Sequence, residues 1–307
     1  PELGAAAPES RSGSKVFAKT DAGPDGIAVD ALGNVYTANS RANTVTKVTA
    51  SGKASRLGPT GKTPRGIAVD SSGNVYTSNL GDNTVTKITP GGSSSVLGTT
   101  GSKPIDVAVD AAGNVYTTNY ADSTVTKITP GGVSSVHAAT GSRPLGITLD
   151  RQGNVYTANE GANNVTKITP GGAASTLGKT GSWPQAIAID RSGNIYTANW
   201  NSRNVSKITP KGSSAIYGKT GRRPIGIAVD PHGAVFTTND GANSVSKINR
   251  KGRSKVIAST GRRPIGIASD AAGFLYTFFF NDTATTEIYT SPKGSPSVLT
   301  LNTVSVL

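Results

Sequence analysis

Short runs of alternating apolar and polar residues follow one another along almost the whole chain. In the stretch 61–100 they fall at residues 66–70 (GIAVD), 74–79 (NVYTSN), 84–89 (TVTKIT) and 94–99 (SSVLGT). The runs are rich in Val, Ile, Thr and Tyr, and clusters of Gly, Pro, Asn and Ser separate them, which is typical of strands joined by turns. No stretch shows the 3.6-residue period of an amphipathic helix. The pattern therefore predicts four short β-strands and no helix.

This unit of four strands repeats every 40 residues without insertion or deletion. Its clearest motif, D-x-x-G-N-V-Y-T-x-N, begins at Asp30, Asp70, Asp110, Asp150, Asp190, Asp230 and Asp270. A period of this length indicates an array of supersecondary units that bury their apolar faces against one another. Four antiparallel strands in about 40 residues form one blade of a β-propeller. We therefore predict an all-β fold, a β-propeller of four-stranded antiparallel blades, with strands a to d running outward from the channel.

The two ends of the repeat array predict how the ring closes. Residues 14–20 (SKVFAKT) closely match the strand d segment 254–260 (SKVIAST), although no blade precedes them. The last repeat supplies strand a at 266–270 and strand b at 274–277. Pairing these strands with residues 14–20 would complete a ring of seven blades and remove an exposed sheet edge. Six blades with an overhang is the alternative.

The expected domain organisation is a linker at 1–13, a β-propeller at 14–277 and a tail at 278–307 that does not belong to the repeat. Residues 281–290 (NDTATTEIYT) translate a widely used sequencing adapter word for word, and the three Phe before them fit a poly-T spacer. We interpret the tail as an assembly artefact in a metagenomic fragment. Its residues 286–290 still suit strand c, because Thr, Ile and Tyr favour strands.

The repeat motif resembles a known family. The pattern G-I-A-V-D-x-x-G-N-V-Y-T-x-N-x-x-x-N-x-V-x-K-I, best seen from Gly66 to Ile88, is similar to the NHL repeat. It is most similar to the propellers that form extracellular sensor domains of bacterial serine/threonine kinases. Gluconolactonases and virginiamycin B lyase are more distant relatives. The resemblance implies a sensor, scaffold or binding propeller, with enzymes among the relatives, and an extracellular or periplasmic location.

The polar residues that recur in every copy have a predicted structural role. The Asp that opens the motif is expected to cap backbone amides of the a–b turn, and its Gly to adopt positive φ. The Asn that closes the motif, Asn39 in the first copy, is expected to bond the backbone of the b–c loop. The lysine on strand c, such as Lys47, is expected to reach into solvent.

Specific function must therefore come from positions where the copies differ. Both kinds of variable loop, d–a and b–c, emerge on one face of a propeller, which we call the mouth face. The predicted ligand-binding residues there are Lys103, Arg143, Trp183, Arg223 and Arg263 on the d–a loops and Tyr120, Glu160 and Trp200 on the b–c loops.

Charge narrows the class of partner. The formal net charge is +13, which favours an anionic partner. An acidic glycan or cell-wall polymer is the expected ligand, and nucleic acid or a protein partner is the alternative. Trp and Tyr side chains could stack on sugars or bases. Basic loops that only keep the protein soluble would give the same composition.

The enzyme interpretation is disfavoured by the chemistry that the sequence offers. Its two histidines, His137 on an outer strand and His232 in an a–b turn, lie away from the mouth face, whereas virginiamycin B lyase works with a histidine near a bound metal. A gluconolactonase-like site would need a metal held by acids, for which Asp106, Glu160 and Asp240 are the weak candidates. We expect no cofactor and no catalytic residue. With no Cys, thiol chemistry and disulfides are excluded.

Overall fold

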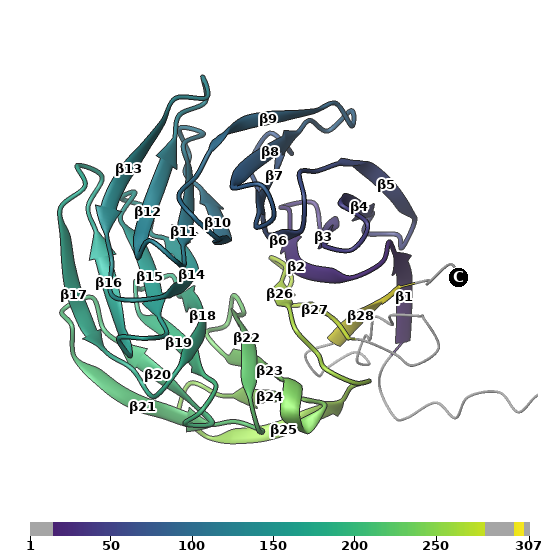
Figure 1. Cartoon of the computed structure of the whole chain (residues 1–307). Coiled ribbons are helices and arrows are strands. Elements are labelled where there is room, and N and C mark those ends of the chain that lie inside the picture. The colour runs from purple at the N-terminus through teal and green to yellow at the C-terminus, as the bar shows by residue number, and fades with distance from the viewer. Residues whose placement is uncertain (1–14, 280–297, 304–307) are drawn as a thin grey trace, which may run out of the picture.

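The computed structural model of the chain describes residues 15–279 and 298–303. Within these residues, four-stranded sheets stand around a central axis as the blades of a propeller (Figure 1). Consecutive strands β2 to β25 form six antiparallel sheets, which we number blades 1 to 6. One further sheet, the closing sheet, has the order β1-β28-β27-β26. The predicted fold is confirmed, with six regular blades, the alternative count, and an irregular sheet where a seventh blade was expected.

The inner strands, strands a, are β2 (Pro24–Val29), β6 (Pro64–Val69), β10 (Pro104–Val109), β14 (Pro144–Leu149), β18 (Pro184–Ile189), β22 (Pro224–Val229) and β26 (Ile267–Ser269). Strands b are β3 (Val35–Asn39), β7 (Val75–Asn79), β11 (Val115–Asn119), β15 (Val155–Asn159), β19 (Ile195–Asn199), β23 (Val235–Asn239) and β27 (Leu275–Phe278).

Strands c are β4 (Thr44–Val48), β8 (Thr84–Ile88), β12 (Thr124–Ile128), β16 (Asn164–Ile168), β20 (Asn204–Ile208) and β24 (Ser244–Ile248). Strands d are β5 (Ala54–Pro59), β9 (Ser94–Thr99), β13 (Ser134–Ala139), β17 (Ala174–Lys179), β21 (Ser214–Lys219) and β25 (Ser254–Ser259). The closing sheet adds β1 (Lys15–Thr20) and β28 (Val298–Thr303), and a 3-10 turn, η1 (Asp240–Ala242), lies in one b–c loop.

The hydrophobic core lies between neighbouring blades. At the junction of blades 1 and 2, Tyr36 and Val45 of blade 1 cluster with Ile67, Val75 and Ile88 of blade 2. Strand b is buried along its whole length in every regular blade, because it has a neighbouring strand on each edge and a neighbouring blade on each face. Each blade therefore depends on its neighbours for its core, as the 40-residue period predicts.

The closing sheet joins the two ends of the chain. Strand β1 lies at its outer edge, so the predicted position of the N-terminal segment is confirmed. The neighbouring strand β28 runs parallel to both β1 and β27, unlike strand c of a regular blade. Parallel pairing needs a long crossover connection, and residues 279–297 supply that length. Residues 1–13 and the expected strand c at 286–290 lie outside the described residues.

Two phenylalanines of the expected tail belong to the core of the closing sheet. Phe278 is fully buried against Val35, Val48 and Tyr276, at a position where the regular blades have Ala, Ser or Thr. Phe279 is 2% exposed and takes the place of the repeated Asn. The irregular sequence therefore begins inside the closing sheet. No helix in the described part of the chain is long and apolar enough to cross a membrane.

Candidate functional site

The Asp that opens each motif is committed to the structure of its own turn. In blade 1, Oδ1 of Asp30 accepts hydrogen bonds from the backbone N–H groups of Leu32 and Asn34 at 2.9 and 2.8 Å. Its Oδ2 accepts from Asn34 Nδ2 at 2.7 Å and from the Tyr36 hydroxyl at 3.0 Å. Burial alone would raise the pKa of Asp30, but these hydrogen bonds hold it below its usual value. Gly33 has φ +78°, as predicted.

The Asn that closes each motif bonds to side chains and not to the loop backbone, so the predicted partner was wrong. Asn119, for example, is fully buried and donates from Nδ2 to the hydroxyls of Thr124 and Thr126 at 2.9 and 2.8 Å. Its Oδ1 accepts from Thr117 at 3.3 Å. The strand positions of these threonines explain the result, because the hydroxyls face the amide across the b–c hairpin.

The strand c lysines are also more constrained than predicted. Lys47 Nζ lies 5.5 Å from the centroid of the Tyr36 ring, and Lys87 Nζ lies 5.8 Å from that of Tyr76. This spacing is that of a cation–π interaction. These lysines therefore stabilise the blades and are unsuitable as neutral controls in a charge experiment.

The two variable positions of each blade are held side by side by one backbone hydrogen bond. In blade 5, the Trp200 N–H donates to the carbonyl oxygen of Trp183 at 2.9 Å. Trp183 has φ +59°, a left-handed conformation. The same bond joins the corresponding residues of the other regular blades, which gives the pairs Gly23/Ser40, Thr63/Leu80, Lys103/Tyr120, Arg143/Glu160 and Arg223/Asp240. We call them mouth pairs: a constant backbone frame presents two variable side chains per blade.

The mouth pair of blade 5 forms an aromatic platform. The rings of Trp183 and Trp200 are stacked, with centroids 5.2 Å apart and an interplanar angle of 24°. The guanidinium of Arg223, from the next d–a loop, lies 5.0 Å from the centroid of Trp200. Trp200 is thus held between Trp183 and Arg223, whereas Trp183 remains 46% exposed. The ring available to a ligand is therefore Trp183, with Trp200 and Arg223 as its support.

A second group of contacts lies on the neighbouring blades. The Tyr120 hydroxyl donates to Glu160 Oε2 at 3.1 Å, and Gln185 Nε2 donates to Glu160 Oε1 at 3.3 Å. Burial and Glu160 raise the pKa of Tyr120, and Arg143 acts in the opposite direction. Glu160, on blade 4, therefore connects Tyr120 of blade 3 with Gln185 of blade 5 in the wall of the channel. Among the described residues, Lys103 and Arg143 form no ion pair, and both are exposed.

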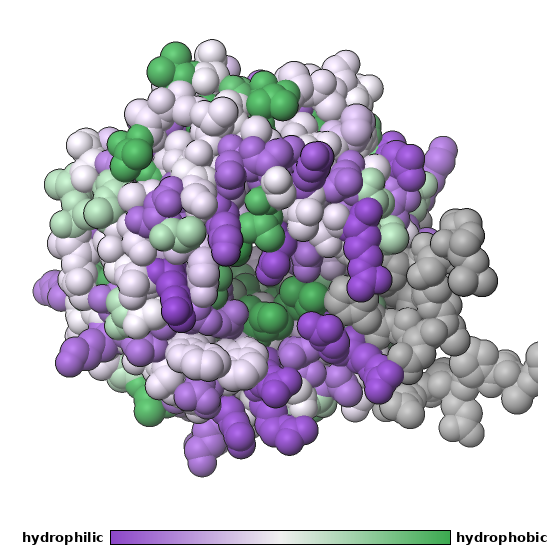
Figure 2. All heavy atoms as spheres, in the orientation of Figure 1, coloured by the Kyte–Doolittle hydropathy of each residue, from purple (hydrophilic) through white to green (hydrophobic). Residues whose placement is uncertain are grey.

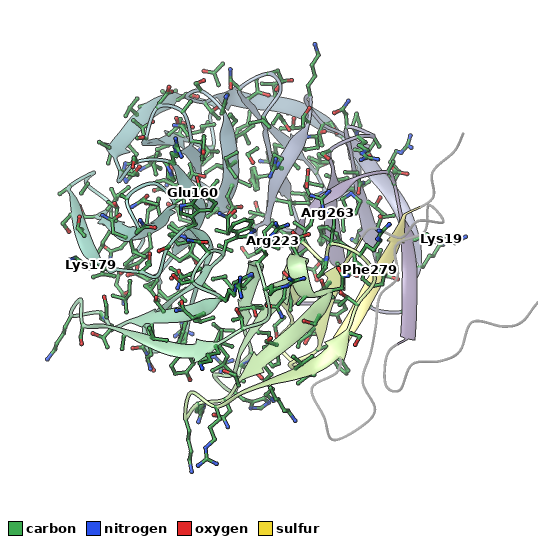
Figure 3. All side chains as sticks on the ribbon, turned by 60° about the horizontal axis from the view of Figure 1, so that its bottom comes forward. Lys19, Glu160, Lys179, Arg223, Arg263 and Phe279 are labelled. Carbon is green, nitrogen blue, oxygen red and sulfur yellow. The ribbon has the colours of Figure 1, made fainter. Side chains whose placement is uncertain are left out.

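Two other arginines of the mouth face have polar partners. Arg263 Nε lies 3.4 Å from Asp240 Oδ1, and the Arg263 side chain is still 71% exposed. Arg222 donates from Nε and Nη2 to the Gly241 carbonyl at 3.2 and 3.0 Å. Glu160, Arg223 and Arg263 lie toward the middle of the ring, whereas Lys179 and Lys19 lie at its outer edge (Figure 3).

The mouth opens into a central channel of about 310 Å³. Six inner strands, β2 to β22, contribute three residues each to its wall, and Ile265 and Gly266, together with Ile267 of β26, complete it; the third residue of each set is an Ile or Val. Figure 2 shows the hollow at the centre of the ring, with hydrophobic residues inside it and hydrophilic residues around it. The polar groups in the wall are Asp25, Arg65, Asp106 and Gln185. Asp25 and Arg65 form an ion pair of 3.8 Å.

Asp106 stands where five other inner strands have Gly and one has Ala. Its Oδ1 accepts from the Val107 N–H at 2.9 Å, and its Oδ2 accepts from the Ile147 N–H of the next blade at 3.1 Å. Burial raises the pKa of Asp106 to about 6, although both backbone hydrogen bonds favour the charged form. The carboxylate fits because Gly66 beside it has no side chain: a Cβ there would lie 2.8 Å from Asp106 Oδ1.

The weak metal candidates do not form a group. Asp106 is hydrogen-bonded within the channel wall, Glu160 accepts from Tyr120 and Gln185, and Asp240 is paired with Arg263. Across residues 15–279 and 298–303, no three His, Cys, Asp or Glu side chains lie together as a metal site. His137 lies on β13 against Tyr116, and His232 lies in an a–b turn on the face opposite the mouth, which we call the back face.

Sequence reasoning named the mouth residues but missed those of the channel wall. Gln185, Arg65 and Asp25 follow the Pro that opens strand a, at a position that also varies between copies. That variation was the available signal. Asp106 was considered only as a metal ligand, whereas the Gly and Ala at the same position in the other copies were a signal that this side chain lies close against the next inner strand.

The fold and the site define a repeat β-propeller with a variable, cationic and aromatic mouth over a narrow channel. The sequence profile of the virginiamycin B lyase family matches residues 3–240 and, overlapping them, residues 55–291, so the chain belongs to that family. No curated protein matches the sequence significantly.

Solved structures agree on the fold. A streptogramin B lyase covers 94% of this chain and 95% of its own, with a TM-score of 0.75 and 17% identity. A catalytically inactive histidine-to-alanine variant of virginiamycin B lyase from Staphylococcus aureus with quinupristin has a TM-score of 0.74 and 18% identity, and the match covers 95% of this chain and 98% of that one. Hydrazine synthase from Kuenenia stuttgartiensis has a TM-score of 0.72 and 17% identity, and the match covers 85% of this chain and 94% of that one. At these identities the likeness shows the fold alone.

The residues of this chain do not fit the metal and histidine that the lyase resemblance implies. Its two histidines are remote from the mouth, and the mouth carboxylates are engaged by hydrogen bonds or an ion pair.

Proposed function

We propose that the chain is a non-catalytic binding propeller, a sensor or scaffold, that recognises an extended anionic ligand at its mouth face. An acidic glycan or a cell-wall polymer is the expected ligand, and an extracellular or periplasmic location is proposed with it. The observation that carries the proposal is the set of mouth pairs. One fixed backbone frame brings variable cations and aromatic rings to the same face in successive blades.

The geometry suits an extended ligand better than a small one. The cations Lys103, Arg143, Arg223 and Arg263 come from four of five successive d–a loops, and so they follow the rim of the channel. Trp183 lies among them with an exposed ring. Several weak charge contacts along a chain, combined with one stacked ring, give affinity without a deep pocket.

The first test is a screen with acidic glycans, teichoic polymers and single-stranded nucleic acids at low and physiological salt. The proposal predicts binding to an acidic glycan or cell-wall polymer that weakens as salt rises, because exposed charges are screened within about 8 to 10 Å at physiological ionic strength. Preferential binding to nucleic acid would mean that the partner is a nucleic acid and not a glycan or cell-wall polymer. Absence of any salt-sensitive binder would refute the proposed site.

The stacking residue is tested separately. Trp183→Ala should weaken binding roughly tenfold, in line with the ~1–3 kcal/mol of a stacked ring, and should leave the salt slope nearly unchanged. Trp200→Ala should cost more, since Trp200 supports both Trp183 and Arg223. Phe274→Ala is the matched control, because Phe274 is an aromatic residue of similar exposure, 42%, in an a–b turn of the back face. An equal loss in the control would contradict the assignment.

A metal-dependent lyase or hydrolase is the second candidate, and family membership is the observation that favours it. Incubation with quinupristin and a divalent metal ion, followed by liquid chromatography and mass spectrometry, tests it. We expect quinupristin to be recovered unchanged. Turnover that Asp106→Asn abolishes would replace the binding proposal with the enzymatic one.

A further inference from the structure

A second cavity lies on the back face between blades 5 and 6, where the repeat again departs from its consensus. It has a volume of about 460 Å³, and Asp190, Arg191, Lys207, Tyr217, Asp230 and Arg250 contribute to its wall. Three substitutions occur together at this junction. Ala234 and Phe236 replace the Asn and Tyr of the motif, and Tyr217 stands where the other strands d have Leu, Ile or His. We call this cavity the blade 5–6 pocket.

The substitutions free one oxygen of a buried carboxylate. In blades 1 to 5, Oδ2 of the turn Asp accepts from an Asn Nδ2 and a Tyr hydroxyl; for Asp190 these distances are 2.8 and 3.0 Å. Asp230 is 6% exposed and keeps only the bond from the Ala234 N–H to Oδ1, at 2.8 Å. Its Oδ2 receives no hydrogen bond from the described residues. Asp230 lines the pocket, so this oxygen can accept a hydrogen bond from a ligand there.

The rest of the wall is cationic. Arg250 lies against the same turn as Asp230, since a Cβ on Gly233 would come within 3.1 Å of Arg250 Nε. Lys207 Nζ lies 5.6 and 5.5 Å from the ring centroids of Tyr196 and Tyr217. Together with Arg191, the wall has three cations and two carboxylates. None of these cations forms a salt bridge with Asp230 in the described part of the chain.

We propose that the blade 5–6 pocket binds a small zwitterion of the amino-acid type. The ligand ammonium would donate to Asp230 Oδ2, and the ligand carboxylate would face Arg191 and Arg250. A simple anion would leave the Asp230 oxygen without a donor and add repulsion to it. A simple ammonium would meet a wall with an excess of positive charge. This site is separate from the mouth face and goes beyond the proposed function.

The test uses the whole chain and the free proteinogenic L-amino acids as probes, each added at millimolar concentration and followed by ¹H–¹⁵N spectroscopy. At least one amino acid should shift the amide signals of Arg191, Gly233 and Ala234. Its N-acetyl and carboxamide derivatives should each bind at least roughly tenfold more weakly, since each lacks one of the two charged contacts. If no amino acid binds, or if acetate or inorganic phosphate binds as tightly, the proposal is wrong.

A variant that restores the repeat gives a sharper test because it should not harm folding. Ala234→Asn combined with Phe236→Tyr returns to Asp230 the two donors that Asp190 has. The double variant should melt at or above the temperature of the parent and lose amino-acid binding, while binding at the mouth is unchanged. Retained affinity in this variant would overturn the proposal. Arg250→Pro, which also restores the residue common to most copies, should independently weaken amino-acid binding.

Discussion

The interior of each blade and the mouth pairs are built on the same backbone, yet they use their residues in opposite ways. Inside the blade, Asp70, Tyr76 and Asn79 are bonded to neighbours in a pattern that recurs with little change around the ring. At the mouth, Trp183 and Trp200 occupy positions that Lys103 and Tyr120 fill two blades earlier. The repeat thus keeps the hydrogen-bonded residues inside the blade constant, whereas the two residues of each mouth pair vary from blade to blade.

In the closing sheet, this network of repeated hydrogen-bonding residues is incomplete. It lacks the repeated Asn, has a parallel strand next to its outer strand, and fills its interior with Phe278 and Phe279. Because it joins both ends of the chain, it is the sheet whose loss opens the ring.

The largest expected effect is therefore on closure. Deleting residues 1–20 removes β1 and the contact of Ala18 with the cluster of Val35, Val48, Tyr276 and Phe278. We expect Tm to fall by roughly 10 °C or more, which corresponds to a few kcal/mol for a domain of this size. Differential scanning calorimetry measures it. An unchanged Tm would show that β1 does not close the ring.

Removing one residue of the hydrogen-bond network inside a blade should have the next largest effect on stability. Asn119→Ala removes the donor to Thr124 and Thr126 and the acceptor of the buried Thr117 hydroxyl, at a cost of about 3 kcal/mol. Tm should fall by roughly 6 to 12 °C. Asn201→Ala, in an exposed b–c loop, is the matched control and should stay within about 0.5 kcal/mol of the parent. Equal effects would mean that the frame is not what stabilises the blade.

Asp106 should make stability depend on pH. Burial raises its pKa in the folded protein from the ordinary value of 3.8 to about 6, so folding disfavours the charged form. The penalty is present above about pH 6 and is relieved as pH falls toward 3.8. Asp106→Asn should therefore be more stable relative to the parent at pH 7.5 than at pH 4.5. A difference in Tm that is the same at both pH values would contradict the raised pKa.

The smallest stability effect is expected at the mouth. Arg143→Glu, alone, should change the free energy of unfolding by no more than about 0.5 kcal/mol, because the side chain is exposed and has no ion pair among the described residues. Urea denaturation measures this. A loss comparable to that of Asn119→Ala would show that the mouth residues belong to the frame.

The fold was predictable because the 40-residue period and the strand pattern act together. For blade 2, the predicted strand at 94–99 coincides with β9, and the others differ by one or two residues at their ends. The closing sheet was predicted only in part. Its parallel strand β28 follows an irregular segment that carries no repeat signal.

The site was predictable as a set of positions and not as a set of contacts. Variation between copies identified Trp183 and Trp200 as candidate binding residues. It did not indicate that Arg223, from the next blade, lies over the Trp200 ring. Nor did the sequence indicate that Asn119 bonds to threonines, because each of those residues also suits a strand for its own propensity. Contacts between side chains 20 or more positions apart depend on how blades pack, which one copy of the motif does not encode.

We propose that the mouth face, and not the overall positive charge, binds an anionic polymer. The most direct test is the salt dependence of binding to an acidic glycan or teichoic polymer for two variants with the same net charge. One carries Arg143→Glu, Arg223→Glu and Arg263→Glu at the mouth; the other carries Lys53→Glu, Arg151→Glu and Lys211→Glu in exposed turns of the back face. The account predicts that the mouth variant binds at least roughly tenfold more weakly with a shallower salt slope, and that the back-face variant stays close to the parent. Equal losses in the two variants would contradict it.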